Sequence, residues 1–273
     1  MTSAHTLIQA RYADNETLPD AAWNETLETL LAHRSIRSYT SQALPEHALE
    51  ILVAAAQSAA TSSNLQLWSV IAVEDIERRA RLSVLAGNQG QIRQAPLFLV
   101  WLADLARLRH VAYAKNMAAD GLDYLEMFAM AVVDAAIAAQ NAVIAAESLG
   151  LGTVYIGALR NQPEQTAAEL GLPEGVFPIF GLCVGYAEPE AAPAIKPRLP
   201  QEVVLHREQY QMENQDAGIS RYDATMSEFY NQHYMTTSGN WSLHSAKRIS
   251  SPERLSGRDR LKEALNALGF KLL

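Results

Sequence analysis

The residues best suited to chemistry lie in the stretch AHRSIRSYTSQALP, residues 32–45, between two segments with helical periodicity. The stretch contains three basic side chains with four hydroxyl groups among them: His33, Arg34 and Arg37, then Ser35, Ser38, Thr40 and Ser41. The whole chain has a formal net charge of −8, so a local group of cations needs an explanation. A guanidinium binds two oxygens of a phosphate at once, and hydroxyl groups add neutral donors. We therefore predict that this stretch binds an anionic ligand.

A second basic segment, Lys196-Pro197-Arg198, lies far along the chain. Proline restricts the backbone, so the two cations project from a short, rigid turn. For a lone arginine, a solvated surface charge is the better explanation. Two such segments in an acidic chain, whose other charges lie mostly on helix faces, favour binding of an anion instead.

Two polar loops could complete such a site, namely TSSNLQ at residues 61–66 and GNQGQ at residues 87–91. Hydroxyl and amide groups both donate and accept hydrogen bonds, as a polyol chain or a pyrimidine edge requires. Taken alone, each loop is explained about equally well as an ordinary polar surface loop.

Several familiar motifs are absent from the sequence. It has no GxxxxGK[ST] loop, and GLGTVYIG has Tyr155 where a dinucleotide fingerprint needs its third glycine. That segment also leads into a predicted strand rather than out of one. The histidines form no HxxxH or HExxH pair, so no metal site is predicted. Cys183 lies within a predicted strand, where a small buried apolar residue is a better interpretation than a nucleophile.

The bulk composition limits the class of protein. Of the 273 residues, 49% are hydrophobic and 19% charged, as in an ordinary globular protein. One cysteine allows no intrachain disulfide, and the first thirty residues lack a signal-peptide pattern, so we expect a cytoplasmic location. The most apolar run, residues 126–148, is interrupted by Asp134, Gln140 and Asn141, so no membrane span is expected. A pI of about 5.4 without a basic stripe argues against nucleic-acid binding.

Helices and strands are predicted on both sides of the polar segments. Apolar residues at helical spacing predict helices over residues 22–33, from Pro45 to the TSSN cluster, over 124–149 and near 258–268. β-Branched and aromatic runs predict strands over residues 68–74, 96–104, 152–159 and 177–186. The helix over 124–149 is apolar on most sides, so we expect it to be buried, either centrally or against a second subunit.

The predicted organisation is a single α+β domain in three segments. Residues 1–24 are an N-terminal extension, residues 25–200 the ligand-binding core, and residues 201–273 a C-terminal extension that packs on the core or on a partner subunit. The Pro-rich passage YAEPEAAPAIKPRLP could mark a domain boundary. The residues beyond it are too polar to form a good core of their own, which favours one domain.

In their order along the chain, these segments resemble a known family. The oxygen-insensitive NAD(P)H nitroreductase and flavin reductase branch of the nitroreductase superfamily has similar segments in the same order: HRSIRSYT, SAATSSNLQ, AGNQGQIRQAP, AAQNAVIAAESLGLGTVYIGALRN, PIFGLCVGY and KPRLP. The resemblance extends from about residue 25 to the C-terminus.

The resemblance implies a mixed sheet flanked by helices and an intertwined homodimer, with the C-terminal extension reaching over the partner. It also implies a tightly but non-covalently bound FMN at the dimer interface. By position, the phosphate would be held by His33, Arg34, Lys196 and Arg198. Ser35 would contact the phosphate or the ribityl chain, and Arg37 the N1 and O2 edge of the ring. The partner chain would supply Thr61, Ser62, Ser63, Asn64 and Gln89 to the ribityl and pyrimidine parts. Backbone amides near N5 and O4 would come from Tyr155, Gly157, Ala158 and Leu159.

The activity implied by the resemblance is that of an FMN-dependent oxidoreductase with a ping-pong cycle. NADPH or NADH gives a hydride to the flavin and leaves, and a nitroaromatic, a quinone or free flavin then takes two electrons. A cation near N1 and O2 stabilises the anionic reduced flavin. Solvent or the flavin can supply protons, so no catalytic side chain is expected. The alternative is a flavin-binding sensor module with little turnover.

Four departures from the family's pattern bear on these expectations. Ala158 replaces the second glycine of YIGGLRN, which is tolerable unless the backbone there has a positive φ. Asn64 stands where close relatives carry an apolar aromatic residue, so the entrance to the ring is expected to be more polar. Residues 104–124 are longer than usual and are expected to shape the mouth of the site. Residues 236–242, TTSGNWS, lack the arginines that would bind the 2′-phosphate of NADPH, so the choice between NADPH and NADH is open.

Overall fold

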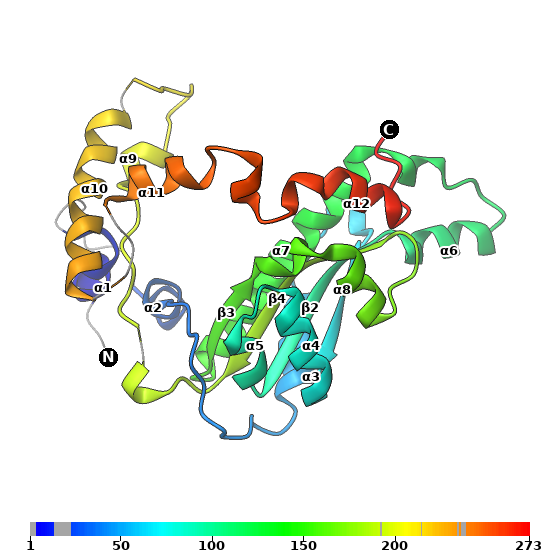
Figure 1. Cartoon of the computed structure of the whole chain (residues 1–273), viewed down its shortest axis with the longest axis horizontal. Coiled ribbons are helices and arrows are strands. Elements are labelled where there is room, and N and C mark those ends of the chain that lie inside the picture. The colour runs from blue at the N-terminus through cyan, green and yellow to red at the C-terminus, as the bar shows by residue number, and fades with distance from the viewer. Residues whose placement is uncertain (1–3, 14–22, 192, 214, 234, 236–238) are drawn as a thin grey trace. The chain divides into compact units, whose positions relative to one another are not determined.

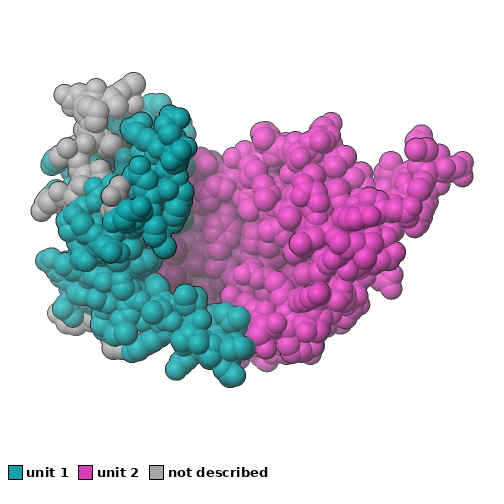
Figure 2. Space-filling model, turned by 90° about the horizontal axis from the view of Figure 1, so that it is seen from above, with its two compact units in different colours: residues 1–34, 193–255 teal, residues 35–192, 256–273 magenta. Residues whose placement is uncertain are grey.

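The computed structural model describes residues 4–13, 23–191, 193–213, 215–233, 235 and 239–273, and Figure 1 labels their helices and strands. The chain divides into two compact units, coloured separately in Figure 2. Unit 1 comprises Met1–Arg34 and Pro193–Leu255, and unit 2 comprises Ser35–Ala192 and Ser256–Leu273.

Unit 2 is built on a sheet with the strand order β1-β2-β4-β3. The strands are β1 (Trp68–Val73), β2 (Leu97–Asp104), β3 (Gly152–Ile156) and β4 (Val176–Gly185). Neighbouring strands pair antiparallel, and among the described residues the parallel pairing of a mixed sheet is limited to a bridge between Ser35 and Thr153. All four predicted strands are confirmed. β3 ends three residues before the predicted end at 159, because Gly157–Asn161 form a 3-10 turn.

The helices of unit 2 include three that the sequence predicted. They are α3 (Ala48–Gln57), α7 (Leu125–Ser148) and α12 (Leu261–Ala267). The prediction of one helix near 258–268 was too long, because Arg258–Arg260 form a separate 3-10 turn. Four further helices were not predicted: α4 (Ile76–Leu85), α5 (Gly90–Gln94), α6 (Ala106–Ala114) and α8 (Pro163–Leu170). Further 3-10 turns lie at Ser62–Asn64, Asp120–Asp123 and Pro189–Ala191.

Strand β2 shows how the sheet is covered by helices. Every residue of β2 is buried. Phe98, Val100 and Leu102 lie in one apolar cluster with residues of α4 and α5, whereas the alternate residues Leu97, Leu99 and Trp101 lie in another with α3 and α7. Successive side chains of a strand point to opposite faces, so a strand with a helical layer on each face reads as a continuous apolar run. The sheet of unit 2 therefore lies between two layers of helices (Figure 1).

Helix α7 is the described helix that could cross a membrane by length and composition alone. Core helices meet the same test, so this is weak evidence. In the structure Ala138, Ala142 and Val143 of α7 pack against β2 and α3, and Asp134 is buried. The prediction of a buried helix is confirmed for this face. On other positions of α7, Val133 and Ile137 are 55% and 40% exposed.

Unit 1 is helical. Its helices are α1 (Ala4–Tyr12), α2 (Glu25–Ala32), α9 (Gln201–Val204), α10 (Gln215–Gln232) and α11 (Trp241–Arg248), with a 3-10 turn at Pro252–Leu255. The helix predicted over 22–33 corresponds to α2, which begins after Asn24 because the Asn24 side chain accepts a hydrogen bond from Leu27 N at 3.0 Å and caps the first turn. The helices α1, α9, α10 and α11 were not predicted. An apolar cluster packs α10 against its neighbours. It comprises the buried Tyr222, Met226 and Tyr230, with the partly buried Leu199, Phe229 and Trp241.

Candidate functional site

The segment that contains Ser35 and Arg37 is fixed against the sheet of unit 2. Ile36 N donates to Thr153 O of β3 at 2.8 Å, and the buried Ile36 side chain covers Gly152, where a Cβ would lie only 2.5 Å from Ile36 Cγ1. The Tyr39 hydroxyl donates to Ile36 O at 2.7 Å, and burial raises the pKa of Tyr39, so this donor stays protonated. Ser35 and Arg37 therefore flank a buried residue that is bonded to the edge strand β3, and the Arg37 side chain is exposed.

Strand β3 leads directly into the turn that carries the predicted backbone donors. Tyr155 is 37% exposed and packs edge-on against Phe180, with ring centroids 5.2 Å apart. Ala158 is not among the described residues with a positive φ, so an alanine in place of the family's glycine causes no backbone strain here, as the sequence analysis required. Leu159 is fully buried and fixes the turn to the core cluster on that side of the sheet. The backbone of Gly157 and Ala158 is thus held at the end of β3.

The loop that carries Gln89 lies against this turn. A Cβ built at Gly87 would lie 3.7 Å from Asn161 Nδ2, at the end of the turn. Gln89 O accepts a hydrogen bond from Ser83 Oγ at 2.9 Å, and Gln89 Oε1 accepts one from Gln91 Nε2 at 2.6 Å. Three predicted segments of unit 2 therefore lie along β3. Residues 35–37 lie beside the first residues of the strand, the 157–161 turn follows its last residue, and the 87–89 loop lies against that turn.

The other predicted loop, residues 61–64, is hydrogen-bonded to helix α7. Thr61 Oγ1 donates to Asp134 Oδ2 at 2.5 Å, and Ser62 N donates to Asp134 Oδ1 at 3.1 Å, so the loop is bound to α7. Ser62, Ser63 and Asn64 are exposed. Among the described residues, none of the hydrogen bonds of this loop reaches the three segments above. The assignment of the loop to a partner's FMN stays a prediction.

In unit 1, a single residue joins the two basic segments. The guanidinium of Arg11 donates to Lys196 O at 3.0 Å and to Leu31 O and His33 O, both at 2.8 Å. Arg198 N donates to Arg11 O at 2.8 Å, and Arg11 is only 6% exposed. Residues 31–33 and 196–198 are therefore anchored to one buried cation, although they lie far apart in the sequence.

The side chains of both basic segments suit an anionic ligand. Arg34 and Arg198 are exposed, and among the described residues neither forms an ion pair with a carboxylate. Arg198 Nη1 instead donates to Lys196 O at 3.1 Å and to Pro197 O at 3.3 Å. The buried hydroxyl of Tyr222 also donates to Pro197 O, at 3.0 Å, and fixes the turn to α10. Exposed guanidinium groups without an acidic partner fit the phosphate of an FMN.

Sequence reasoning missed Arg11 and Asp134. Arg11 lies in a short helix outside the resemblance, and one arginine there forms no pattern that marks a site. Asp134 was noted only as an interruption of an apolar helix, although a carboxylate in a buried helix needs donors and is a usable signal. Cys183 is fully buried and burial raises the pKa of its thiol, so the interpretation as a small core residue is confirmed.

Comparison with known proteins gives one consistent result. Residues 30–186 match the model of the "Nitroreductase family", and residues 196–273 match the "Nitroreductase family, C-terminal domain". The chain is 43% identical over 212 residues to an FMN reductase (NADPH) of Bacillus subtilis, covering 77% of this chain and 84% of that protein. It is 40% identical over 230 residues to an oxygen-insensitive NADPH nitroreductase of Salmonella typhimurium, covering 84% and 92%.

A solved structure shares the fold along nearly the whole chain. The NADPH:FMN oxidoreductase of Vibrio harveyi, solved in complex with NAD+, superposes with a TM-score of 0.79 at 38% identity. The match covers 91% of this chain and 99% of that one.

Proposed function

Since the chain belongs to the nitroreductase family, we propose that it is an FMN-dependent oxidoreductase that takes two electrons from NADPH or NADH and passes them to nitroaromatics, quinones or free flavin. Bound FMN supplies a ring that accepts a hydride and passes two electrons on. The observation that carries the proposal is the Arg11 anchor, because it gathers the two basic segments expected to bind the phosphate. The relatives are reductases by name, which supports turnover over the sensor alternative.

At the phosphate, the proposed ligands are residues of unit 1. Arg34 and Arg198 contribute guanidinium groups, each able to bind two phosphate oxygens, and Lys196 adds a point charge. His33 serves as a phosphate ligand rather than a proton donor. The buried cation of Arg11 lies behind the backbone of both segments and adds to the positive potential there.

At the ring, the proposed ligands are residues of unit 2. Arg37 binds the N1 and O2 edge and favours the negative charge that develops there on reduction. Ser35 binds the phosphate or the ribityl chain. The backbone amides of residues 155–159 would bind N5 and O4, and the buried Leu159 fixes the turn that carries them. No side chain is assigned to a proton transfer.

We propose a homodimer in which the partner supplies Ser62, Ser63, Asn64 and Gln89 to the ribityl and pyrimidine parts. Apolar side chains exposed on α7, among them Val133 and Ile137, support a contact with a second copy. Sedimentation velocity would test the dimer. The lone Cys183 and the absence of any possible intrachain disulfide support a reducing compartment, the cytoplasm.

The choice between NADPH and NADH rests on the segment before Trp241. Residues 236–238 of TTSGNWS lie outside the described residues. Lys247 and Arg248 lie in the last turn of α11. The sequence before Trp241 has no cation for a 2′-phosphate, which supports use of both nucleotides, and steady-state kinetics with each of them tests this.

The proposed function is tested by purifying the protein and recording its absorption spectrum. A yellow protein with a flavin spectrum that bleaches on addition of NADPH or NADH without air, and that recovers on addition of a quinone or nitroaromatic, is expected. A protein that remains colourless after incubation with FMN would exclude the function. A coloured protein that no reduced nicotinamide bleaches would favour the sensor.

A further inference from the structure

The loop between α3 and β1 has an unusual backbone. Ser63, Asn64 and Gln66 have φ values of 50°, 55° and 51°, in the left-handed region that favours glycine. Asparagine tolerates this region better than most residues, whereas serine and glutamine have no such preference. Three such residues within four positions persist only where the surroundings impose the conformation.

The buried carboxylate of Asp134 on α7 imposes it from one side. Asp134 is 2% exposed and accepts hydrogen bonds from Thr61 Oγ1 at 2.5 Å, Ser62 N at 3.1 Å and Leu67 N at 3.3 Å. Thr61 Oγ1 in turn accepts a hydrogen bond from Gln66 N at 3.0 Å. The two ends of the loop thus meet at one carboxylate. The single hydroxyl proton of Thr61 is used on Asp134, so that hydroxyl has no second proton to donate to a ligand.

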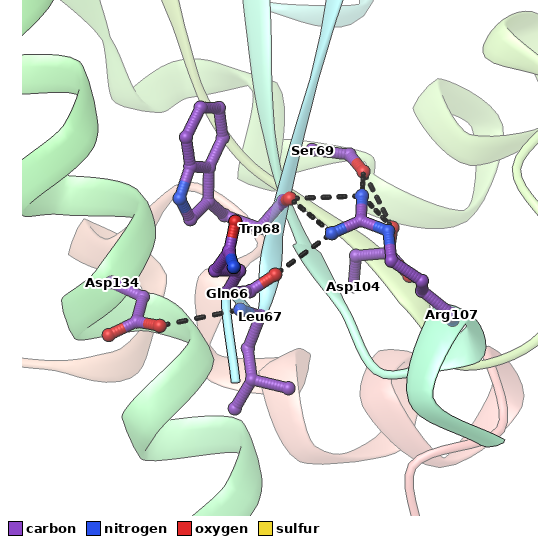
Figure 3. Close-up of polar contacts among 7 residues, drawn as sticks. All are labelled: Gln66, Leu67, Trp68, Ser69, Asp104, Arg107 and Asp134. Atoms are coloured by element: carbon purple, nitrogen blue, oxygen red, sulfur yellow. Dashed lines mark hydrogen bonds and ion pairs between the residues drawn. The ribbon is translucent and has the colours of Figure 1, made fainter. Parts of the chain in front are cut away.

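The guanidinium of Arg107 holds the outgoing end of the loop from the other side. Arg107 Nη1 donates to Gln66 O at 2.9 Å and to Trp68 O at 3.2 Å, and Arg107 Nη2 forms an ion pair with Asp104 Oδ2 at 3.0 Å. Figure 3 shows Asp134 approaching the chain at Leu67 and Arg107 approaching at Gln66 and Trp68. Arg107 lies in α6, within the 104–124 segment that the sequence predicted to shape the mouth of the site.

The two charges divide the free backbone groups of the loop between them. A carboxylate only accepts hydrogen bonds, and it takes N–H groups of residues 62 and 67. A guanidinium only donates, and it takes the C=O groups of residues 66 and 68. Residues 62, 66 and 67 lie outside the strands, so the two side chains supply hydrogen bonds that a sheet ladder would otherwise supply. The side chains of Ser62, Ser63, Asn64 and Gln66 are left exposed.

We propose that Asp134 and Arg107 are positioning residues that hold the 61–67 loop in the conformation that presents Ser62, Ser63 and Asn64 to the flavin. The Thr61 hydroxyl acts through the loop, because it donates to Asp134 and accepts a hydrogen bond from Gln66 N. It does not donate to the cofactor. The proposal rests on the proposed function, since it concerns a contact with FMN.

The test is a matched pair of substitutions at Thr61. Thr61→Val keeps the shape but removes the hydroxyl, and Thr61→Ser keeps the hydroxyl. Loss of a hydrogen bond to a charged group predicts that the Kd of the apoprotein for FMN rises about 10- to 100-fold in Thr61→Val, whereas Thr61→Ser stays within about threefold of the wild type. Hydrogen exchange, measured without FMN, should quicken at the amides of Ser62, Gln66 and Leu67 in Thr61→Val and remain unchanged in the sheet.

The outcomes separate this proposal from the proposed function. Wild-type apoprotein that takes up no FMN would refute the function itself. Wild-type protein that binds FMN while Thr61→Val binds it equally well would refute the positioning role alone. Equal losses in Thr61→Val and Thr61→Ser would show that the hydroxyl is not the determinant, and would also refute it. If Thr61→Val does not fold, Arg107→Gln gives the same readout at a side chain that is 47% exposed, with faster exchange expected over residues 66–69 and a raised Kd.

Discussion

Replacing Arg11 with methionine removes the side-chain hydrogen bonds that join the two basic segments of unit 1, while keeping an unbranched apolar stem. Arg11 is 6% exposed, and its guanidinium donates to three carbonyl oxygens at 2.8–3.0 Å. Hydrogen bonds that involve a charged group contribute about 1.5–3 kcal/mol each. Water reaches part of the vacated site, so we expect the free energy of unfolding to fall by about 3–5 kcal/mol rather than by the full sum.

The same substitution should weaken FMN binding. Without the guanidinium, residues 31–33 and Lys196 lose the side chain that binds both of them, so the phosphate must do more to order the two segments when it binds. We expect the Kd for FMN to rise about 10- to 100-fold, which corresponds to about 1.4–2.7 kcal/mol. Quenching of FMN fluorescence during titration into apoprotein measures the Kd, and urea unfolding measures the stability. Arg11→Lys keeps the charge without the planar fork and should give intermediate values.

Arg221→Met is the matched control. It removes the same charge from the same unit, at an exposed ion pair with Glu202 whose side chains are 45% and 53% exposed. Such a pair contributes about 0–1 kcal/mol, so stability and FMN affinity should barely change. Equal changes of Kd in Arg11→Met and Arg221→Met would refute the anchoring role and leave only a general charge effect. Full recovery in Arg11→Lys would show that the fork is not needed.

Three further predictions follow from other contacts. Lys196→Ala combined with Arg198→Ala should raise the Kd for FMN at least about 100-fold, since each cation contributes about 1.5 kcal/mol or more; fluorescence titration measures this, and an unchanged Kd contradicts it. Arg37→Ala should slow the bleaching of bound FMN by NADPH about 10- to 100-fold in a stopped-flow experiment, because the cation proposed to bind N1 and O2 is lost, and an unchanged rate and affinity would remove that role. Lys271 lowers the pKa of Asp123, so this carboxylate stabilises the fold above its unfolded pKa of about 4, and that stability is lost as the pH falls through the lower folded value. Asp123→Asn should therefore flatten the acid dependence of the unfolding free energy in urea titrations, and an unchanged slope contradicts this.

The sheet and its longest helix were predictable because burial leaves a strong trace in the sequence. β2 is buried on both faces and reads as the apolar run PLFLVWLAD, and α7 reads as a long apolar run between turn signals. The helices α4 and α6 were not predicted, because charged residues interrupt their apolar positions, as in IERRARLSVL and ARLRHVAYA. In α10, three of the four buried positions are Tyr222, Met226 and Tyr230, spaced four apart in an otherwise polar helix that is easily read as a tail.

The candidate site was predictable in its residue types but not in its supports. The segments 31–37 and 196–198 stand out as cations in an acidic chain. The residues that hold them, Arg11 and Tyr222, act through backbone carbonyls, which carry no mark in the sequence. Asp134 likewise acts on backbone N–H groups. Partners that bind the main chain can be recognised only once the fold brings them into contact.

The most direct test of the central claim compares the binding of FMN and riboflavin, which differ only by the phosphate. If the cations of the two segments bind that phosphate, the apoprotein should bind FMN at least about 100-fold more tightly than riboflavin, since two charge-assisted contacts contribute about 3 kcal/mol or more. The difference should shrink as the salt concentration rises. Equal dissociation constants for the two flavins at low salt would contradict the account.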